Sequence, residues 1–275
     1  MRYALRFLIA AAVAAAPAWA GVEFTMVTKT EGGRGAGMGD MVVKTAAEGE
    51  QARMEWVETK NPMFGKGSYM LVNAKGEMTL VNPEKRTYSK LDFGAMMEGA
   101  GSAMDATAKF GFKMEVEDPK VEKVLEEPGG EILGYPTTHY RWHTTYTTVM
   151  RMPKPMSDRR MPADTTEDVW TTTALGMPAH AVKAFEGMGS SQMLGELKKI
   201  TDLAKAKMTG FRLKSIVVSL GKGGKGAQTT TTTMEVTKLR KADIPPSTFV
   251  IPAGYTETDL MQPQRGPAMP DLNKE

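Results

Sequence analysis

Alternation of apolar and polar residues with a period of two dominates the chain and predicts β-strands. Residues 137–152 show it most cleanly. The apolar members of this stretch share one parity: Tyr140, Trp142, Tyr146, Met150 and Met152. The polar members share the other parity: His139, Arg141, His143 and Arg151. A strand of this kind has one apolar, buried face and one polar, solvent-exposed face.

Turn sequences separate further strands. Asn73-Ala74-Lys75-Gly76 is typical of a hairpin loop between residues 68–72 and 78–81, with Gly76 suited to the left-handed conformation. A second turn is expected at residues 82–85, and a third at Pro128-Gly129-Gly130. Residues 211–220 and 228–238 predict a hairpin, and the apolar run at 248–251 predicts a last short strand.

Two segments break the period of two and favour helices, at residues 91–108 and 178–207. Residues 153–165 are rich in proline and charge and are expected to form a loop before a strand at 168–175. Neither helical segment is spaced as a crossover between parallel strands. The fold class is therefore mainly β: a curved antiparallel sheet or unclosed β-barrel of about ten or eleven strands, with the two helical segments as plugs.

The apolar parity of the strands defines the candidate site. We expect these side chains to share the concave face of the sheet: Phe24, Met26, Trp56, Met78, Leu80, Tyr140, Trp142, Tyr146, Met150 and Trp170. One interpretation is a filled core packed by the two helical segments. The other is a cavity for a lipid or acyl chain, because such cavities are mostly apolar. The 23 methionines suit either interpretation, since methionine adapts to irregular apolar shapes.

The polar chemistry offers little for catalysis. The chain has three histidines and no cysteine, and it lacks nucleophile-elbow, phosphate-loop, zinc-protease and calcium-loop motifs. We therefore expect a protein that is not an enzyme and needs no cofactor. His139 and His143 with Met150 and Met152 have the ligand types of a copper site. Their opposite parities would place them on opposite sides of the sheet, so no metal ligand is predicted.

The first twenty residues have the pattern of a cleaved secretory signal peptide. Arg2 and Arg6 precede a short apolar run, and Ala18-Trp19-Ala20 fits the cleavage rule. Cleavage would leave 33 Lys+Arg against 32 Asp+Glu, too close to neutral for binding to nucleic acid or an anionic membrane. Without cysteine neither a lipid anchor nor a disulfide can form, so we expect a periplasmic protein with no stable membrane anchor. Residues 21–260 are expected to form one domain, followed by a disordered tail at 261–275; the oligomeric state stays open.

Four sequence pieces also resemble a known family. They are residues 82–88 (NPEKRTY), 134–140 (GYPTTHY), Val169-Trp170 and 249–255 (FVIPAGY). With these pieces the chain resembles a family of exported bacterial proteins of unknown function whose fold is similar to the lipoprotein carrier LolA. The resemblance implies an unclosed antiparallel barrel whose mouth is plugged by helices, and it brings no catalytic residues. The function expected from residues and resemblance together is binding of an apolar or lipid-like ligand on the concave face. A structural or interaction module with a filled core and no ligand is the alternative, and a Met/His copper-binding protein is a third, less favoured one.

Overall fold

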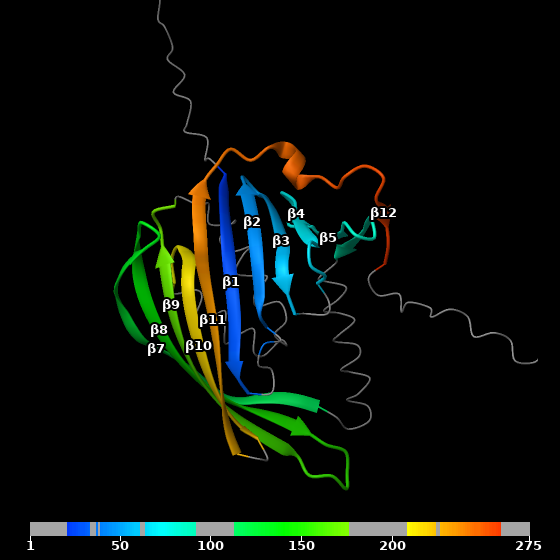
Figure 1. The fold of residues 1–275 in the computed structure, drawn as a ribbon. Coiled ribbons are helices and arrows are strands. Elements are labelled where there is room, and N and C mark those ends of the chain that lie inside the picture. The colour runs from blue at the N-terminus through cyan, green and yellow to red at the C-terminus, as the bar shows by residue number, and fades with distance from the viewer. Residues whose placement is uncertain are drawn as a thin grey trace, which may run out of the picture.

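A computed structural model describes residues 21–33, 37, 39–60, 64–91, 113–175, 208–223 and 226–259. Within them twelve strands form one curved sheet that does not close on itself (Figure 1). This confirms the mainly β fold with an unclosed antiparallel sheet. The predicted signal peptide, the tail at 261–275 and the helical segments, apart from Leu91 at the end of a strand, lie outside the described residues.

The first six strands follow one another along the chain. They are β1 (Val22–Gly32), β2 (Met41–Glu48), β3 (Gln51–Thr59), β4 (Tyr69–Val72), β5 (Met78–Asn82) and β6 (Thr87–Leu91). Five longer strands come next: β7 (Lys113–Ile132), β8 (Tyr135–Arg151), β9 (Arg159–Thr172), β10 (Phe211–Gly223) and β11 (Gly226–Lys241). A 3₁₀ turn, η1 (Pro246–Phe249), and the short strand β12 (Thr256–Glu257) complete the fold.

The strand order shows two antiparallel meanders joined at one seam. β1 to β6 form the first meander and β7 to β11 the second, each with sequence neighbours side by side. The seam is the pairing of β1 with β11, which brings Val22 opposite Lys241. The chain then crosses the end of the first meander, and β12 adds to β6 in parallel (Figure 1). The edges of the sheet are therefore the long strand β7 and the two-residue strand β12.

Several predicted turns are confirmed and one is displaced. Asn73 closes the β4–β5 hairpin through the bond from its N–H to the carbonyl of Glu77, and Gly76 has a φ of 76°. The turn expected at Pro128-Gly129-Gly130 is instead a bulge within β7, where the register shifts between Pro128 and Glu131. The chain reverses later, at Leu133 and Gly134, whose φ values of 52° and 80° fit a tight hairpin turn. The prediction was wrong because Pro and Gly also mark bulges in strands.

The strand limits differ from the prediction in two other places. β9 begins at Arg159, inside the stretch expected to be a loop. The expected strand at 248–251 is wrong: the chain forms η1 and then leaves it in extended conformation outside the sheet. Pro245 and Pro246 explain this, because proline lacks the N–H that a strand ladder needs and suits the first position of a helical turn.

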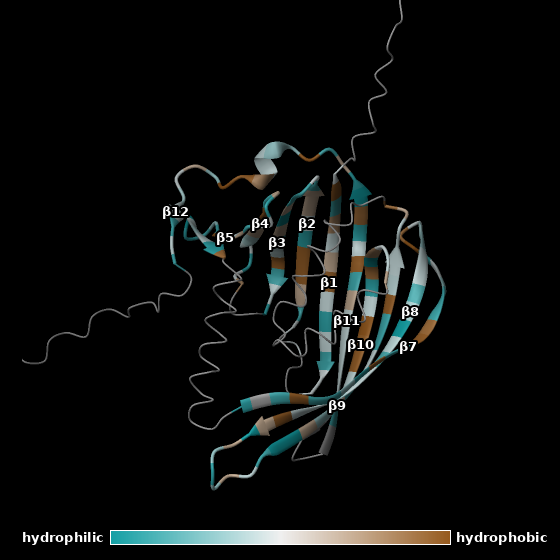
Figure 2. Cartoon of the chain, turned by 180° about the vertical axis from the view of Figure 1, so that it is seen from behind, coloured by the Kyte–Doolittle hydropathy of each residue, from teal (hydrophilic) through white to brown (hydrophobic). Residues whose placement is uncertain are grey.

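The two faces of the sheet follow from the cross-strand partners. Phe24, Thr45, Met54, Met70 and Leu80 are successive partners across five strands, so they share one face, here called the inner face. Partners Thr28, Met234, Ser215, Val169 and Tyr140 continue that face across the second meander. Figure 2 shows the resulting bands of apolar and polar residues along the long strands.

The opposite, outer face is covered at the β4–β5 end by the C-terminal segment. Tyr69, Leu71 and Val81 point outward and pack with Ile251 and Tyr255 from the segment beyond η1. Tyr88 joins this cluster, and its hydroxyl donates to a carboxylate oxygen of Glu257 at 3.0 Å. The first meander is thus apolar on both faces near β4, and it is the C-terminal segment that buries the outer one.

Candidate functional site

Nine of the ten predicted site residues lie on the inner face. β8 has no bulge against β9, so Tyr140, Trp142, Tyr146 and Met150 keep their common parity, as predicted. On the first meander the inner face carries the remaining five: Phe24, Met26, Trp56, Met78 and Leu80. Their sharing of one face is confirmed, while their part in binding a ligand stays a prediction.

Trp170 is the exception, and its predicted position on the inner face is wrong. It is the cross-strand partner of His139, so both rings lie on the outer face. The rings stack with centroids 4.3 Å apart and an angle of 1° between their planes, and the Lys214 Nζ lies 5.5 Å from the Trp170 ring centroid. Val169, fully buried, takes the inner position next to Tyr140. The Trp170 ring is stabilised on the outer face because it stacks on the His139 ring and lies near the Lys214 ammonium group.

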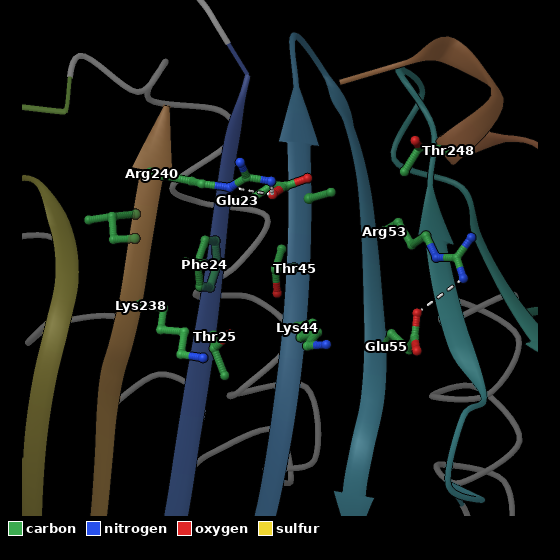
Figure 3. A pocket seen from close by; sticks show the side chains of 12 residues that line it. Glu23, Phe24, Thr25, Lys44, Thr45, Arg53, Glu55, Lys238, Arg240 and Thr248 are labelled. Atoms are coloured by element: carbon green, nitrogen blue, oxygen red, sulfur yellow. Dashed lines mark hydrogen bonds and ion pairs between the residues drawn. The ribbon is translucent and has the colours of Figure 1, made fainter. Parts of the chain in front are cut away.

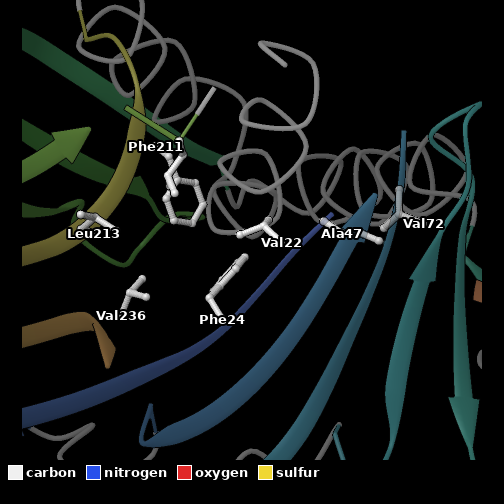
Figure 4. Close-up of a cluster of buried hydrophobic side chains, with 9 residues drawn as sticks. Val22, Phe24, Ala47, Val72, Phe211, Leu213 and Val236 are labelled. Atoms are coloured by element: carbon white, nitrogen blue, oxygen red, sulfur yellow. The ribbon is translucent and has the colours of Figure 1, made fainter. Parts of the chain in front are cut away.

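The inner-face residues form three apolar clusters. Phe24 contacts Phe211 edge-on, with ring centroids 5.1 Å apart, in a cluster that includes Leu213 and Val236 (Figure 4). Trp56 stacks on Phe64 at 4.2 Å in a second cluster with Val43, Met70 and Leu80. Tyr140 and Trp142 form a third with Val121 and Met208. Met26 and Met78 pack against both the first and the second cluster, which makes these two continuous.

Methionine is the residue that sequence reasoning undervalued at this site. Met41 and Met70 contribute to the second cluster beside the predicted Met26 and Met78, and so does Met54. Met54 lies between Arg53 and Glu55, so its parity correctly predicted the face that it shares with Trp56, whereas Met70 lies between two apolar residues and had no such signal. Phe64 had no such signal, because it lies in the connection between β3 and β4 and reaches Trp56 from there.

The inner face changes from apolar to polar along the strands. Away from the three clusters it carries hydroxyl side chains, with Thr30 and Thr232 Oγ1 atoms 3.4 Å apart and Thr165 Oγ1 and Ser219 Oγ at 3.3 Å. Between the two regions Arg212 donates a hydrogen bond to Glu167 at 3.0 Å, and Glu167 is the cross-strand partner of Trp142. Tyr146 lies farther along β8, opposite Ala163, and burial raises the pKa of its hydroxyl above the ordinary value. The inner surface therefore carries its apolar clusters at one end, and hydroxyl side chains lie toward the other end together with Tyr146 and Met150.

Two buried polar groups on this face, Thr45 Oγ1 and Trp142 Nε1, have no hydrogen-bond partner among the described residues. The Trp142 side chain is 1% exposed, and its Nε1–H has no hydrogen-bond partner among the residues that the structure describes. Buried polar groups in folded proteins are nearly always paired, so such a group needs an explanation. The indole N–H lies in the apolar cluster closest to the Arg212–Glu167 pair.

The histidines of β8 lie on the outer face and pair with carboxylates there. His139 Nε2 and Arg141 Nε both contact Asp168 Oδ1, at 2.7 and 2.8 Å, and His143 Nε2 contacts Asp164 Oδ1 at 2.9 Å. Met150 lies on the opposite face, as the parity predicted. Within the described ranges no group of three or more His, Cys, Asp or Glu side chains has the arrangement of a metal site.

A hollow on the outer face was not predicted from the sequence. It has a volume of about 480 Å³ and spans β11, β1, β2 and β3, with Thr248 of η1 at one end (Figure 3). Its charged lining consists of Glu23, Lys44, Arg53, Glu55, Lys238 and Arg240. Because these residues come from strands distant in sequence, no local pattern could have grouped them.

Comparison with known proteins assigns a family to this half-barrel. Residues 35–255 match the model of DUF4412, a domain of unknown function, and the chain belongs to that family. No curated protein matches. Among solved structures, the one described as PNGF-II in P21 space group has 15% identity over 87% of this chain. The TM-score is 0.31 and the match spans 31% of that longer chain, too weak a likeness to support an argument. The implied similarity to LolA therefore stays a prediction.

Among the described residues no helix is long and apolar enough to cross a membrane.

Proposed function

We propose that this protein is an exported, non-catalytic carrier that binds an apolar or lipid-like molecule with a polar head on the inner face of its half-barrel. The observation that carries the proposal is the change in side chains along the inner surface. Methionine-rich apolar clusters lie at one end, and hydroxyl side chains lie toward the other end beside Tyr146 and Met150. An acyl chain fits the former and a polar head the latter, as in ligand sites that combine apolar walls with a few polar groups.

Three further features support a ligand in this position. The sheet is open, because β7 and β12 do not pair with each other, so its inner face is not sealed by strand closure. The unpaired Trp142 Nε1–H is a donor that a ligand oxygen would satisfy. Met26, Met41, Met54 and Met78 are only partly buried, and flexible thioether side chains adapt to chains of different length.

The proposal places the protein in the periplasm, delivered by residues 1–20 as a signal peptide. Its support is the charged, apolar and small-residue order of that segment together with the absence of cysteine. N-terminal sequencing of the protein from its own host tests this directly: a start at Gly21 in the periplasmic fraction is expected. A start at Met1 in the cytoplasmic fraction would contradict it.

Native mass spectrometry of protein purified from its own host tests the ligand, since a carrier should retain a bound lipid. A fluorescent fatty-acid probe gives the second measurement. Trp142→Ala should weaken probe binding, whereas Trp170→Ala, a matched change on the outer face, should leave it unchanged. A homogeneous ligand-free mass together with no probe uptake would leave the alternative, a structural or interaction module with a filled core. In that case Trp142→Ala only lowers stability, by about 3–5 kcal/mol.

A further inference from the structure

Two lysines of the outer-face hollow form no ion pair among the described residues, although Glu55 is the cross-strand partner of one of them, Lys44. Lys238 of β11 and Lys44 of β2 flank Thr25 of β1, each as its cross-strand partner. Neither lysine has an acidic oxygen within 4.0 Å among the described residues, although four other charged side chains line the same hollow. Their backbones are two strand spacings apart, about 10 Å, so the flexible side chains can converge over Thr25.

The acidic groups of the hollow are already paired with arginines. Glu55 accepts from Arg53 Nη2 at 3.1 Å, and Glu23 accepts from Arg240 Nε at 2.7 Å. Arg53 is also held in place by Tyr69, with its Cζ 3.7 Å from the ring centroid. These pairs fix both carboxylates beside arginines. The lining as a whole therefore has four cations and two anions, a surplus of two positive charges.

The shape of the hollow follows from the residues at its centre. Thr25 and Ala46 occupy adjacent rows of the sheet, with long charged side chains on both sides (Figure 3). Small side chains leave a depression there, and the Thr25 hydroxyl adds a neutral donor between the lysines. Thr248 of η1 limits the hollow at the β3 side.

We propose that this hollow binds a tetrahedral oxyanion, a phosphate or sulfate group of a small molecule, between Lys44, Lys238 and the Thr25 hydroxyl. Two ammonium groups and one hydroxyl match the acceptor oxygens of such a group, and charge-assisted bonds are the strong ones. The bound anion also relieves the repulsion between the two lysines. The site lies on the face opposite to the proposed lipid site, so it goes beyond the proposed function and is independent of it.

Calorimetric titration of the full chain with inorganic phosphate tests the site. Lys44→Gln with Lys238→Gln should weaken binding by about tenfold or more, which corresponds to about 1.4 kcal/mol. The matched control is Lys75→Gln with Lys85→Gln, which removes two exposed lysines from turns outside the hollow and should leave the affinity unchanged. Thr25→Val should weaken binding less than the double lysine variant. Circular dichroism confirms that each variant is folded.

Binding measurements with lipid vesicles identify the source of the oxyanion. If inorganic phosphate binds with this dependence on Lys44 and Lys238, the ligand is a free small anion. If only phosphatidylcholine vesicles containing phosphatidylglycerol bind, with the same dependence, the oxyanion is a lipid headgroup. Absence of binding to both, or equal losses in the Lys75/Lys85 control, overturns the proposal.

Discussion

Phe211→Ala probes the contact that ties the two meanders together on the inner face. Phe211 begins β10 and Phe24 lies on β1, with β11 between them, so their edge-on contact reaches across the seam. Both rings are nearly fully buried and share a cluster with Leu213 and Val236. Removing the Phe211 ring leaves a hollow that these strand-bound neighbours cannot fill by a simple rotamer change.

The expected loss follows from that burial. A fully buried Phe replaced by Ala costs about 3–5 kcal/mol, from lost transfer energy and the residual cavity. The ring pair itself contributes about 0.5–1.5 kcal/mol beyond its buried area. At about 2–4 °C per kcal/mol for a domain of this size, Phe211→Ala should lower Tm by at least about 6 °C. A double-mutant cycle with Phe24→Ala should give a coupling of about 0.5–1.5 kcal/mol.

Urea unfolding followed by tryptophan fluorescence gives the loss in unfolding free energy and the coupling, and thermal unfolding gives the Tm; Trp56, Trp142 and Trp170 report on both meanders. Leu220→Ala on the same strand is the control; its side chain is 42% exposed and should change the stability by less than about 0.5 kcal/mol. A Phe211→Ala loss below about 1 kcal/mol, or a coupling indistinguishable from zero, would refute this account of the seam.

Three further predictions concern the outer face and the β7–β8 turn. Asp168→Asn should cost about 1.5–3 kcal/mol in urea unfolding, because one oxygen of this partly buried carboxylate accepts from both His139 and Arg141; Asp164→Asn, at a half-exposed pair with His143, should cost less than about 1 kcal/mol. Leu133→Asn should raise stability by about 1 kcal/mol, since Asn tolerates the positive φ of this turn better than Leu does; an unchanged midpoint would count against a strained turn. Hydrogen bonds from Arg151 and from the Met152 N–H hold the pKa of Asp158 below its ordinary value, so this carboxylate stabilises the fold above its unfolded-state pKa and the contribution disappears as the pH falls through the lowered folded-state pKa. Arg151→Gln should move the Asp158 pKa back up in an NMR titration of the carboxyl carbons, and a pKa that does not move would exclude Arg151 as its main cause.

The sequence allowed correct prediction wherever a strand was regular and its turn local. β8 pairs with β9 without a bulge, so parity alone separated Trp142 from His143. The Asn73–Gly76 hairpin was predictable because its side-chain and backbone bonds are all local. In β7 the same reasoning failed, because three bulges shift its register against β8 and no residue pattern locates all of them.

The parts of the site that escaped prediction depend on long-range pairing. Trp170 was placed by its aromatic character, whereas the register with His139 decides its face. The outer hollow joins residues of β11 to residues of β1, β2 and β3, more than 180 positions away in the chain. Such a site becomes visible only after the seam between the meanders is known.

The pairing of β1 with β11 also constrains the order in which the strands can pair during folding. Every other antiparallel pair joins strands that are consecutive in sequence, so the strands of each meander can pair in chain order. The pairing of Val22 with Lys241 has to wait for nearly the whole domain, and the closure of so long a loop is a slow step of folding. A chain that emerges N-terminus first would hold β1 as an unpaired edge until β11 arrives. Refolding should therefore be limited by this one long-range contact, and linking the ends of β1 and β11 in a circular permutant should accelerate it.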